Sequence, residues 1–114
     1  MKIEEEKTDN AEVVVISYGI TSRVAVKAVQ EARKDGIRVG NVRLITVWPF
    51  PEKRIRELAG KIKAFIVPEI NYGQIVLEVE RCAAGKASVV SVQHLGGGVH
   101  NPDDILNTIK EAAK

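Results

Sequence analysis

The sequence predicts a single α/β domain, residues 1–114, in which a mainly parallel sheet of four to five strands carries helices on both faces. Four apolar runs of strand length alternate with four segments whose apolar residues recur at helical spacing. Strands joined by helices over such short distances require right-handed βαβ crossovers, which make the sheet parallel. Because 45% of the residues are hydrophobic and only 4% are aromatic, we expect a core of Val, Ile, Leu and Ala.

The apolar runs place the strands. Residues 13–18 are apolar on both faces and predict a central strand that ends at Gly19. The other predicted strands cover residues 39–47, 64–67 and 87–92. Pro68 is expected to end the third strand, because proline cannot donate a hydrogen bond to a sheet. Residues 1–7 predict a short edge strand, which residues 8–10 turn back toward the sheet.

Capping residues place the first two helices. Thr21 or Ser22 is expected to cap the first helix, and Gly36 to close it in the left-handed conformation. Pro51 is suited to the first position of a short second helix, which ends before Gly60.

The last two helices are predicted in the same way. Asn71 is expected to cap the third helix, which ends at Gly85. Asn101 caps the fourth, with Pro102 at the first position and two carboxylates in the first turn. The buried face of this last helix is predicted to hold Ile105, Ile109 and Ala112.

The carboxyl ends of the four parallel strands are predicted to meet at one edge of the sheet, which we call the carboxyl rim. Open α/β sheets bind ligands at this edge, so the carboxyl rim is the candidate functional surface. It is expected to contain residues 19–22, 48–50, 69–74 and 96–101.

Charge and cysteine content exclude several classes of protein. The 17 basic and 15 acidic residues are interspersed and leave a net charge of only +2, which predicts neither a nucleic-acid nor a membrane partner. A lone cysteine, Cys82, excludes an intrachain disulfide and suits a reducing cytoplasm. The acidic start of the chain is unlike a signal peptide.

A glycine run precedes the last predicted helix and is a possible anion-binding loop. Gly96, Gly97 and Gly98 would offer free N–H groups near a helix N-terminus, but the interpretation that we favour is that they only shape the loop. His94 and His100 flank the run and suit either loop anchoring or metal binding. Since the sequence offers no clear third ligand, we predict no metal site.

Two further features each allow two interpretations. Cys82 lies on an apolar helix face, which favours a small buried side chain over a reactive thiol. Trp48 and Phe50, next to prolines, form either an exposed contact patch, which we favour, or a seal at the end of the core. Asn71 is expected to cap its helix whether or not it also contacts a ligand or partner.

Three stretches, in this order, resemble one family. They are 13–19 (VVVISYG), 40–51 (GNVRLITVWPFP) and 68–74 (PEINYGQ). Together they resemble the C-terminal domain of the α subunit of 2-oxoacid:ferredoxin oxidoreductases, and the resemblance covers nearly the whole chain. The domain is also similar to the transketolase C-terminal fold, a three-layer α/β/α sandwich whose first strand can run antiparallel.

The resemblance implies a part in the CoA-dependent oxidative decarboxylation of a 2-oxoacid to an acyl-CoA, with electrons passed to ferredoxin. It implies that thiamine diphosphate, Mg²⁺ and iron–sulfur clusters are held elsewhere in the complex, and that this chain alone binds no cofactor and is not active. The rim would then pack against other domains or subunits, or lie near CoA. The residues expected there are Gly19, Thr21, Ser22, Trp48, Pro49, Phe50, Glu69, Asn71, Tyr72, Gly73 and Gln74.

Two other functions remain open from the residues. The chain could be an independent small-molecule or anion-binding module that uses residues 96–101. A self-sufficient enzyme is not expected, because the sequence shows no nucleophile paired with a base, and no catalytic residue is predicted.

Overall fold

The computed structural model describes residues 3–19, 21–45, 50–69, 74–93 and 102–114. A five-stranded sheet forms its middle layer, with the strand order β1-β3-β2-β4-β5. The strands are β1 (Ile3–Glu6), β2 (Val13–Tyr18), β3 (Val39–Leu44), β4 (Ala64–Glu69) and β5 (Ser88–Gln93). The helices are α1 (Thr21–Lys34), α2 (Glu52–Ala59), α3 (Gln74–Ala83) and α4 (Pro102–Ala113).

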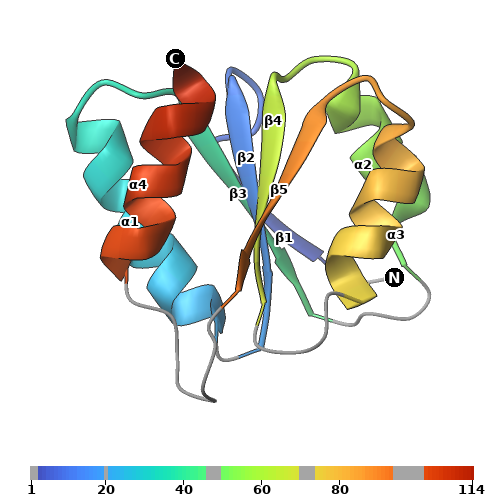
Figure 1. The fold of residues 1–114 in the computed structure, drawn as a ribbon, viewed down its shortest axis with the longest axis horizontal. Coiled ribbons are helices and arrows are strands. Elements are labelled where there is room, and N and C mark those ends of the chain that lie inside the picture. Colours follow the sequence, from blue (N-terminus) through green and yellow to red (C-terminus); the bar gives the residue numbers. More distant parts are fainter. Residues whose placement is uncertain (1–2, 20, 46–49, 70–73, 94–101) are drawn as a thin grey trace.

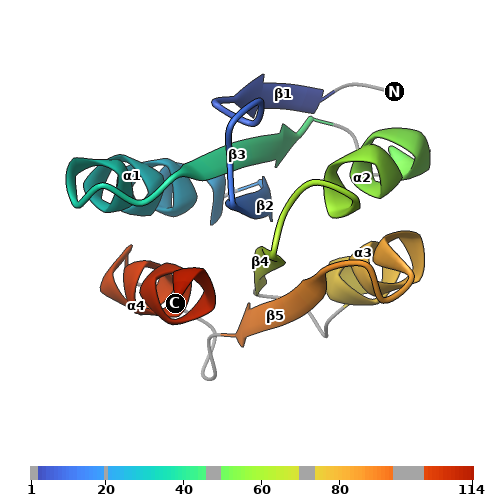
Figure 2. The same ribbon diagram turned by 90° about the horizontal axis from the view of Figure 1, so that it is seen from above.

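The predicted three-layer α/β/α sandwich is confirmed. Helices α1 and α4 cover one face of the sheet, and α2 and α3 cover the other (Figures 1 and 2). Strands β2, β3, β4 and β5 are parallel, whereas β1 runs antiparallel to β3 at the edge of the sheet. The short edge strand predicted at the start of the chain is therefore also confirmed.

Strand β2 is central because both of its faces are apolar. Val13 and Val15 belong to the core cluster beneath α1 and α4, whereas Val14 and Ile16 belong to the cluster beneath α2 and α3. All four side chains are fully buried. Side chains alternate between the faces of a strand, so one β-branched run supplies both cores.

Two strands end two or more residues away from their predicted last residue, and β5 is shifted by one residue. Strand β3 was expected to reach Val47 but ends at Leu44, which is in register with Tyr18, the last residue of β2. Leu44 also faces Ile3, the first described residue of β1, so β3 ends where the described parts of both partner strands end. Strand β4 runs through Pro68 to Glu69, paired with β5 throughout. Its pairing with β2 stops at Ile66, and a proline is tolerated where one side of a strand is unpaired.

The helices begin and end near the predicted capping residues, with two differences. Gly36 and Gly85 have φ angles of 84° and 81°, the left-handed conformation predicted after α1 and α3. Thr21 and Ser22 lie inside α1 instead of capping it, because their hydroxyls bond to the end of β2. Pro51 is the residue before α2, and its carbonyl accepts the first helical bond, from Ile55.

Three predicted features of the helix starts and loops concern residues outside the described ranges. They are the caps at Asn71 and Asn101 and the histidines at 94 and 100. The expected first turn of α4 is present, with Pro102 at its start and Asp103 and Asp104 following. In the described part of the chain, no helix is both long and apolar enough to cross a membrane.

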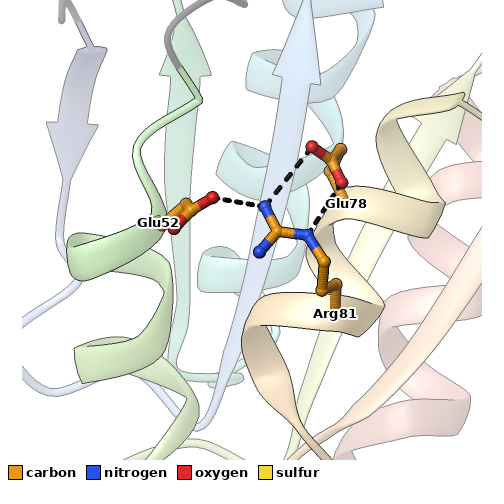
Figure 3. Close-up of polar contacts among 3 residues, drawn as sticks. All are labelled: Glu52, Glu78 and Arg81. Atoms are coloured by element: carbon orange, nitrogen blue, oxygen red, sulfur yellow. Dashed lines mark hydrogen bonds and ion pairs between the residues drawn. The ribbon is translucent and has the colours of Figure 1, made fainter.

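Helices α2 and α3 are joined by a charged bridge on their outer side (Figure 3). The guanidinium of Arg81 in α3 donates to Glu52 of α2 and to Glu78 one turn earlier in α3. Both carboxylates raise the pKa of Arg81, which stays protonated. The adjacent Cys82 is fully buried in the core below, and burial raises the pKa of its thiol. The interpretation of Cys82 as a small buried side chain is confirmed.

Candidate functional site

The turn from β2 to α1 is the best described part of the carboxyl rim. The Thr21 hydroxyl donates to the Tyr18 carbonyl over 2.7 Å, and the backbone N–H of Ser22 donates to the Gly19 carbonyl over 3.0 Å. Gly19 has a φ angle of 64°, which a glycine adopts without strain. Ser17 and Ser22 add a buried hydroxyl pair at 3.3 Å.

These bonds give the predicted rim residues different roles. Thr21 and Ser22 are only 2% and 5% exposed, so their side chains hold the turn in shape. Gly19 is exposed and leaves its backbone open to a neighbour. The turn thus presents main chain to its surroundings, while its hydroxyls are used internally.

Two large apolar side chains on the rim were not predicted as site residues. Tyr18, at the end of β2, is 42% exposed, and Ile45, directly after β3, is 40% exposed. Both lie at the same edge of the sheet, because Tyr18 is in register with Leu44, the residue before Ile45. Only one other large apolar side chain in the described ranges, Leu77 of α3, is as exposed. The position of Tyr18 at the end of an apolar run was a signal in the sequence, whereas Ile45 lies inside the run predicted as the second strand and gave none.

A cleft of about 660 Å³ opens beside this turn and carries positive charge. Gly19, Ser22, Arg23, Val26 and Arg43 line it. Arg43 forms an ion pair with Glu4 of β1 at 3.0 Å, whereas Arg23 has no partner among the described residues. Together with the positive end of the α1 dipole, Arg23 makes the cleft attractive to an anion. Neither arginine was predicted as a site residue.

Phe50 requires a correction. It was expected to form an exposed contact patch with Trp48, but it is only 6% exposed and packs in the core cluster that contains Ile55 and Leu58. An aromatic ring at the start of α2 fills the space between that helix and the sheet. The alternative, that Phe50 seals the end of the core, is the one that the structure supports.

The other predicted rim residues lie at or beyond the limits of the described ranges. The backbones of Glu69 and Gln74 end β4 and begin α3 at the rim. The remaining ones fall outside the described ranges: Trp48, Pro49, Asn71, Tyr72, Gly73 and the possible anion loop Gly96, Gly97 and Gly98. Within the described ranges, no group of three or more His, Cys, Asp or Glu residues could hold a metal ion.

Comparison with known proteins identifies the family. Residues 11–105 match the family described as pyruvate:ferredoxin oxidoreductase core domain II. The chain belongs to this family. Among its relatives, the 2-oxoglutarate synthase subunit KorA of Methanothermobacter marburgensis is 47% identical over 102 residues, which cover 90% of this chain and 27% of that subunit.

Relatives with other 2-oxoacids in their names are also similar to this core domain II. The ketoisovalerate oxidoreductase subunit VorB of M. marburgensis is 44% identical over 113 residues, 99% of this chain and 32% of that subunit. The chain therefore spans about a third or less of the length of the curated relatives it matches.

Solved structures agree with this assignment. The 2-oxoglutarate:ferredoxin oxidoreductase from Magnetococcus marinus, with 2-oxoglutarate, coenzyme A and succinyl-CoA bound, superposes with a TM-score of 0.81 at 25% identity. The superposition covers 100% of this chain and 20% of that one. A split-gene transketolase shares the fold with a TM-score of 0.80 at 18% identity, over 92% of this chain and 39% of that one. The predicted resemblance to both folds is confirmed.

Proposed function

We propose that this core domain II is part of the α subunit of a 2-oxoacid:ferredoxin oxidoreductase. Such an enzyme converts a 2-oxoacid and CoA to an acyl-CoA and passes the electrons to ferredoxin. The match of residues 11–105 to the family carries this proposal. It is supported by the names of the relatives, which are subunits of 2-oxoglutarate synthase, ketoisovalerate oxidoreductase and pyruvate synthase.

In this proposal the domain serves assembly and shapes the region of the active site, and it is not catalytic alone. The exposed Tyr18 and Ile45 support a docking role for the carboxyl rim, because both are large apolar side chains that this edge of the sheet leaves open to a partner. The exposed Gly19 between Tyr18 and α1 lets another backbone approach closely. The partners are the other domains and subunits of the oxidoreductase, and ferredoxin and CoA reach the domain only through the complex.

Cofactors are assigned to other parts of the complex. This assignment is supported by the described residues, in which no group of three or more His, Cys, Asp or Glu could hold a metal ion. The single cysteine cannot ligate an iron–sulfur cluster by itself. We place the protein in the cytoplasm, where a lone buried cysteine stays reduced, with no nucleic-acid or membrane partner.

Replacing the apolar rim residues tests this role. We expect the double variant Tyr18→Ser and Ile45→Ser to fold normally, since both side chains are largely exposed, but to lose association with the remaining subunits when they are coexpressed. Leu77→Ser is the matched control, because Leu77 is 63% exposed on α3. Association that survives the rim variant, or that fails equally in the control, would remove the support for docking through the rim.

The cleft with Arg23 favours one second candidate, an anion-binding module. The predicted site for this function was the glycine run at 96–98, whereas the described cleft lies at the start of α1. Melting the chain with 1 mM CoA or a nucleotide tests it. A ligand present at a hundred times its Kd stabilises a protein by about 2.7 kcal/mol. We expect Arg23→Gln to abolish any such shift, and a shift that persists would rule out the cleft.

A further inference from the structure

The two edges of the described sheet differ in length and charge. At one edge, β1 has only four residues, and three of them, Glu4, Glu5 and Glu6, are acidic. At the other edge, β5 has six residues, Ser88–Gln93, and none of them is charged, a proline or a glycine. Natural proteins protect the open edge of a sheet with short strands, charged side chains or prolines, because an unpaired strand binds other strands. Strand β1 has this protection, whereas β5 lacks it.

The backbone of β5 is paired on one side only. Strand β4 is its single neighbour in the described sheet. The N–H of Ser88 donates to the Lys63 carbonyl at 3.0 Å, so the backbone of Ser88 faces β4. Backbone groups alternate in direction along a strand, and Val89 and Ser91 therefore turn their N–H and C=O groups away from β4. In the described part of the chain, no strand pairs with that side of β5.

The outer edge of β5 is also open to a partner. Figure 2 shows β5 at one limit of the molecule, with α3 and α4 over its two faces and no described helix or strand beyond it. Ser88 and Ser91 are exposed, and Val89 and Val90 are half-buried. Val89 packs on the core cluster beneath α2 and α3, and Val90 packs on the cluster beneath α1 and α4. The strand therefore carries an apolar side chain on each face, next to its unpaired backbone groups.

We propose that β5 pairs with β5 of a second copy of this chain. The two strands run antiparallel about a twofold axis, and the two sheets join into one continuous sheet. Such an interface uses the same patch on both chains, so the patch must be complementary to itself. An uncharged strand with unpaired N–H and C=O groups meets this condition, because each copy supplies the donors and acceptors that the other needs.

The direction of the backbone groups selects the register of this pairing. Residues that point outward must face each other, and within β5 the register centred on Ser91 makes the most hydrogen bonds, about six. In this register Ser91 faces Ser91 of the second copy, and Val89 faces Gln93. On the other face of the joined sheet, Val90 lies opposite Val92, so apolar side chains continue across the interface. None of these rows places like charges opposite each other.

Engineered cysteines in the purified chain test this register. The Cα atoms of the two Ser91 residues would lie about 5.5 Å apart, a separation that a disulfide spans. We therefore expect Ser91→Cys to form a disulfide-linked dimer on mild oxidation, as seen on nonreducing gels. Ser88→Cys is the matched control, because Ser88 is exposed on the same strand but its two copies would lie six residues of about 3.4 Å each, or about 20 Å, apart. The native Cys82 is fully buried and should not contribute.

Charged side chains at position 91 test the pairing without a crosslink. We expect the wild-type chain to sediment as a dimer whose fraction increases with protein concentration. Ser91→Lys and Ser91→Glu should each sediment as monomers, because like charges would face each other, whereas an equimolar mixture of the two should recover the dimer. Ser91 is exposed, so all of these variants are expected to fold. Asn107→Lys adds a charge at an exposed position of α4 and should leave the dimer unchanged.

Several results would overturn the proposal. They are a wild-type chain that is monomeric at every concentration, equal crosslinking of Ser91→Cys and Ser88→Cys, and a Ser91→Lys chain that dimerises like the wild type. A dimer that is lost in Tyr18→Ser but kept in Ser91→Lys would place the contact at the carboxyl rim instead and would also overturn it. None of these measurements uses the other subunits of the oxidoreductase, so the test is independent of the proposed function.

Discussion

Gly40 shows how a single residue fixes the path of the chain. A Cβ atom placed there would lie 3.0 Å from the carbonyl oxygen of Lys7 and 3.0 Å from the Cα atom of Thr8. Both are backbone atoms, which cannot move aside as a flexible side chain can. The segment after β1 therefore packs directly on the backbone of β3, and only glycine permits this contact.

We therefore expect Gly40→Ala to lower the free energy of unfolding by about 1–3 kcal/mol, the usual cost of overpacking. Urea denaturation measures this change. Gly60→Ala is the control, because its Cβ would meet nothing closer than 3.6 Å and its φ angle of −75° suits alanine. A similar decrease in the free energy of unfolding of the two variants would contradict the close backbone contact at Gly40.

Glu5 and Arg54 give stability that depends on pH. Arg54 donates two hydrogen bonds of 2.8 Å to the two carboxylate oxygens, and these lower the pKa of Glu5 in the folded protein. A folded pKa below the unfolded value of about 4.3 stabilises the fold at neutral pH. This stabilisation is lost as the pH falls through the folded pKa.

Accordingly, Glu5→Gln should destabilise the protein by about 1 kcal/mol at pH 7, and the difference from wild type should shrink below pH of about 4. Unfolding curves at pH 7, 5 and 3 measure this. Glu4→Gln is the comparison, because the Arg43–Glu4 pair is largely exposed and should contribute less. A difference that grows in acid would show that the assigned cause is wrong.

At the scale of elements, a strand or helix could be predicted where its own residues determine its structure. β2 was predicted at its observed bounds because Val13 to Tyr18 is β-branched and apolar on both faces. The ends of β3 and β4 were not, because the length of a neighbouring strand sets them, and no local pattern records that length. The bonds of the Thr21 and Ser22 hydroxyls to residues three and five positions earlier were not predicted either, because a hydroxyl at a helix start suits both a cap and a bond back to the preceding strand.

The bridge at Arg81 leads to a prediction about the α2–α3 layer. Arg81→Ala removes the contacts with both Glu52 and Glu78 and leaves the two carboxylates without their shared cation. We expect a lower Tm at low ionic strength and a smaller difference in 1 M salt, since exposed pairs are screened. Arg33→Ala is not equivalent, because Arg33 donates to two backbone carbonyls and to the Asn10 amide oxygen, all uncharged acceptors, so its effect should persist in salt. A decrease in Tm for Arg81→Ala that is the same at low ionic strength and in 1 M salt would contradict this explanation.

At the scale of the whole molecule, the sandwich and the carboxyl rim followed from topology alone, since parallel strands end on one edge. The side chains that matter on the rim did not. In the sequence, Tyr18 looks like the end of an apolar run, Ile45 like an interior strand residue, and Phe50 like an exposed aromatic between prolines. Only the packing shows which of them faces outward. The buried Asn41 of β3, whose Oδ1 atom accepts no hydrogen bond in the described part of the chain, was not predicted either. A single polar residue in a strand does not show whether its side chain will find a hydrogen-bond donor.

The proposed function makes this domain one part of a larger enzyme. It belongs to core domain II of the pyruvate:ferredoxin oxidoreductases, and its relatives are about three or more times its length. One measurement tests the proposed function directly. The tagged chain is isolated from its native cells, and the proteins that co-purify with it are assayed for thiamine diphosphate and iron. We predict a complex that contains both and reduces ferredoxin with a 2-oxoacid and CoA. A chain recovered alone, without thiamine diphosphate or iron, would contradict the proposal.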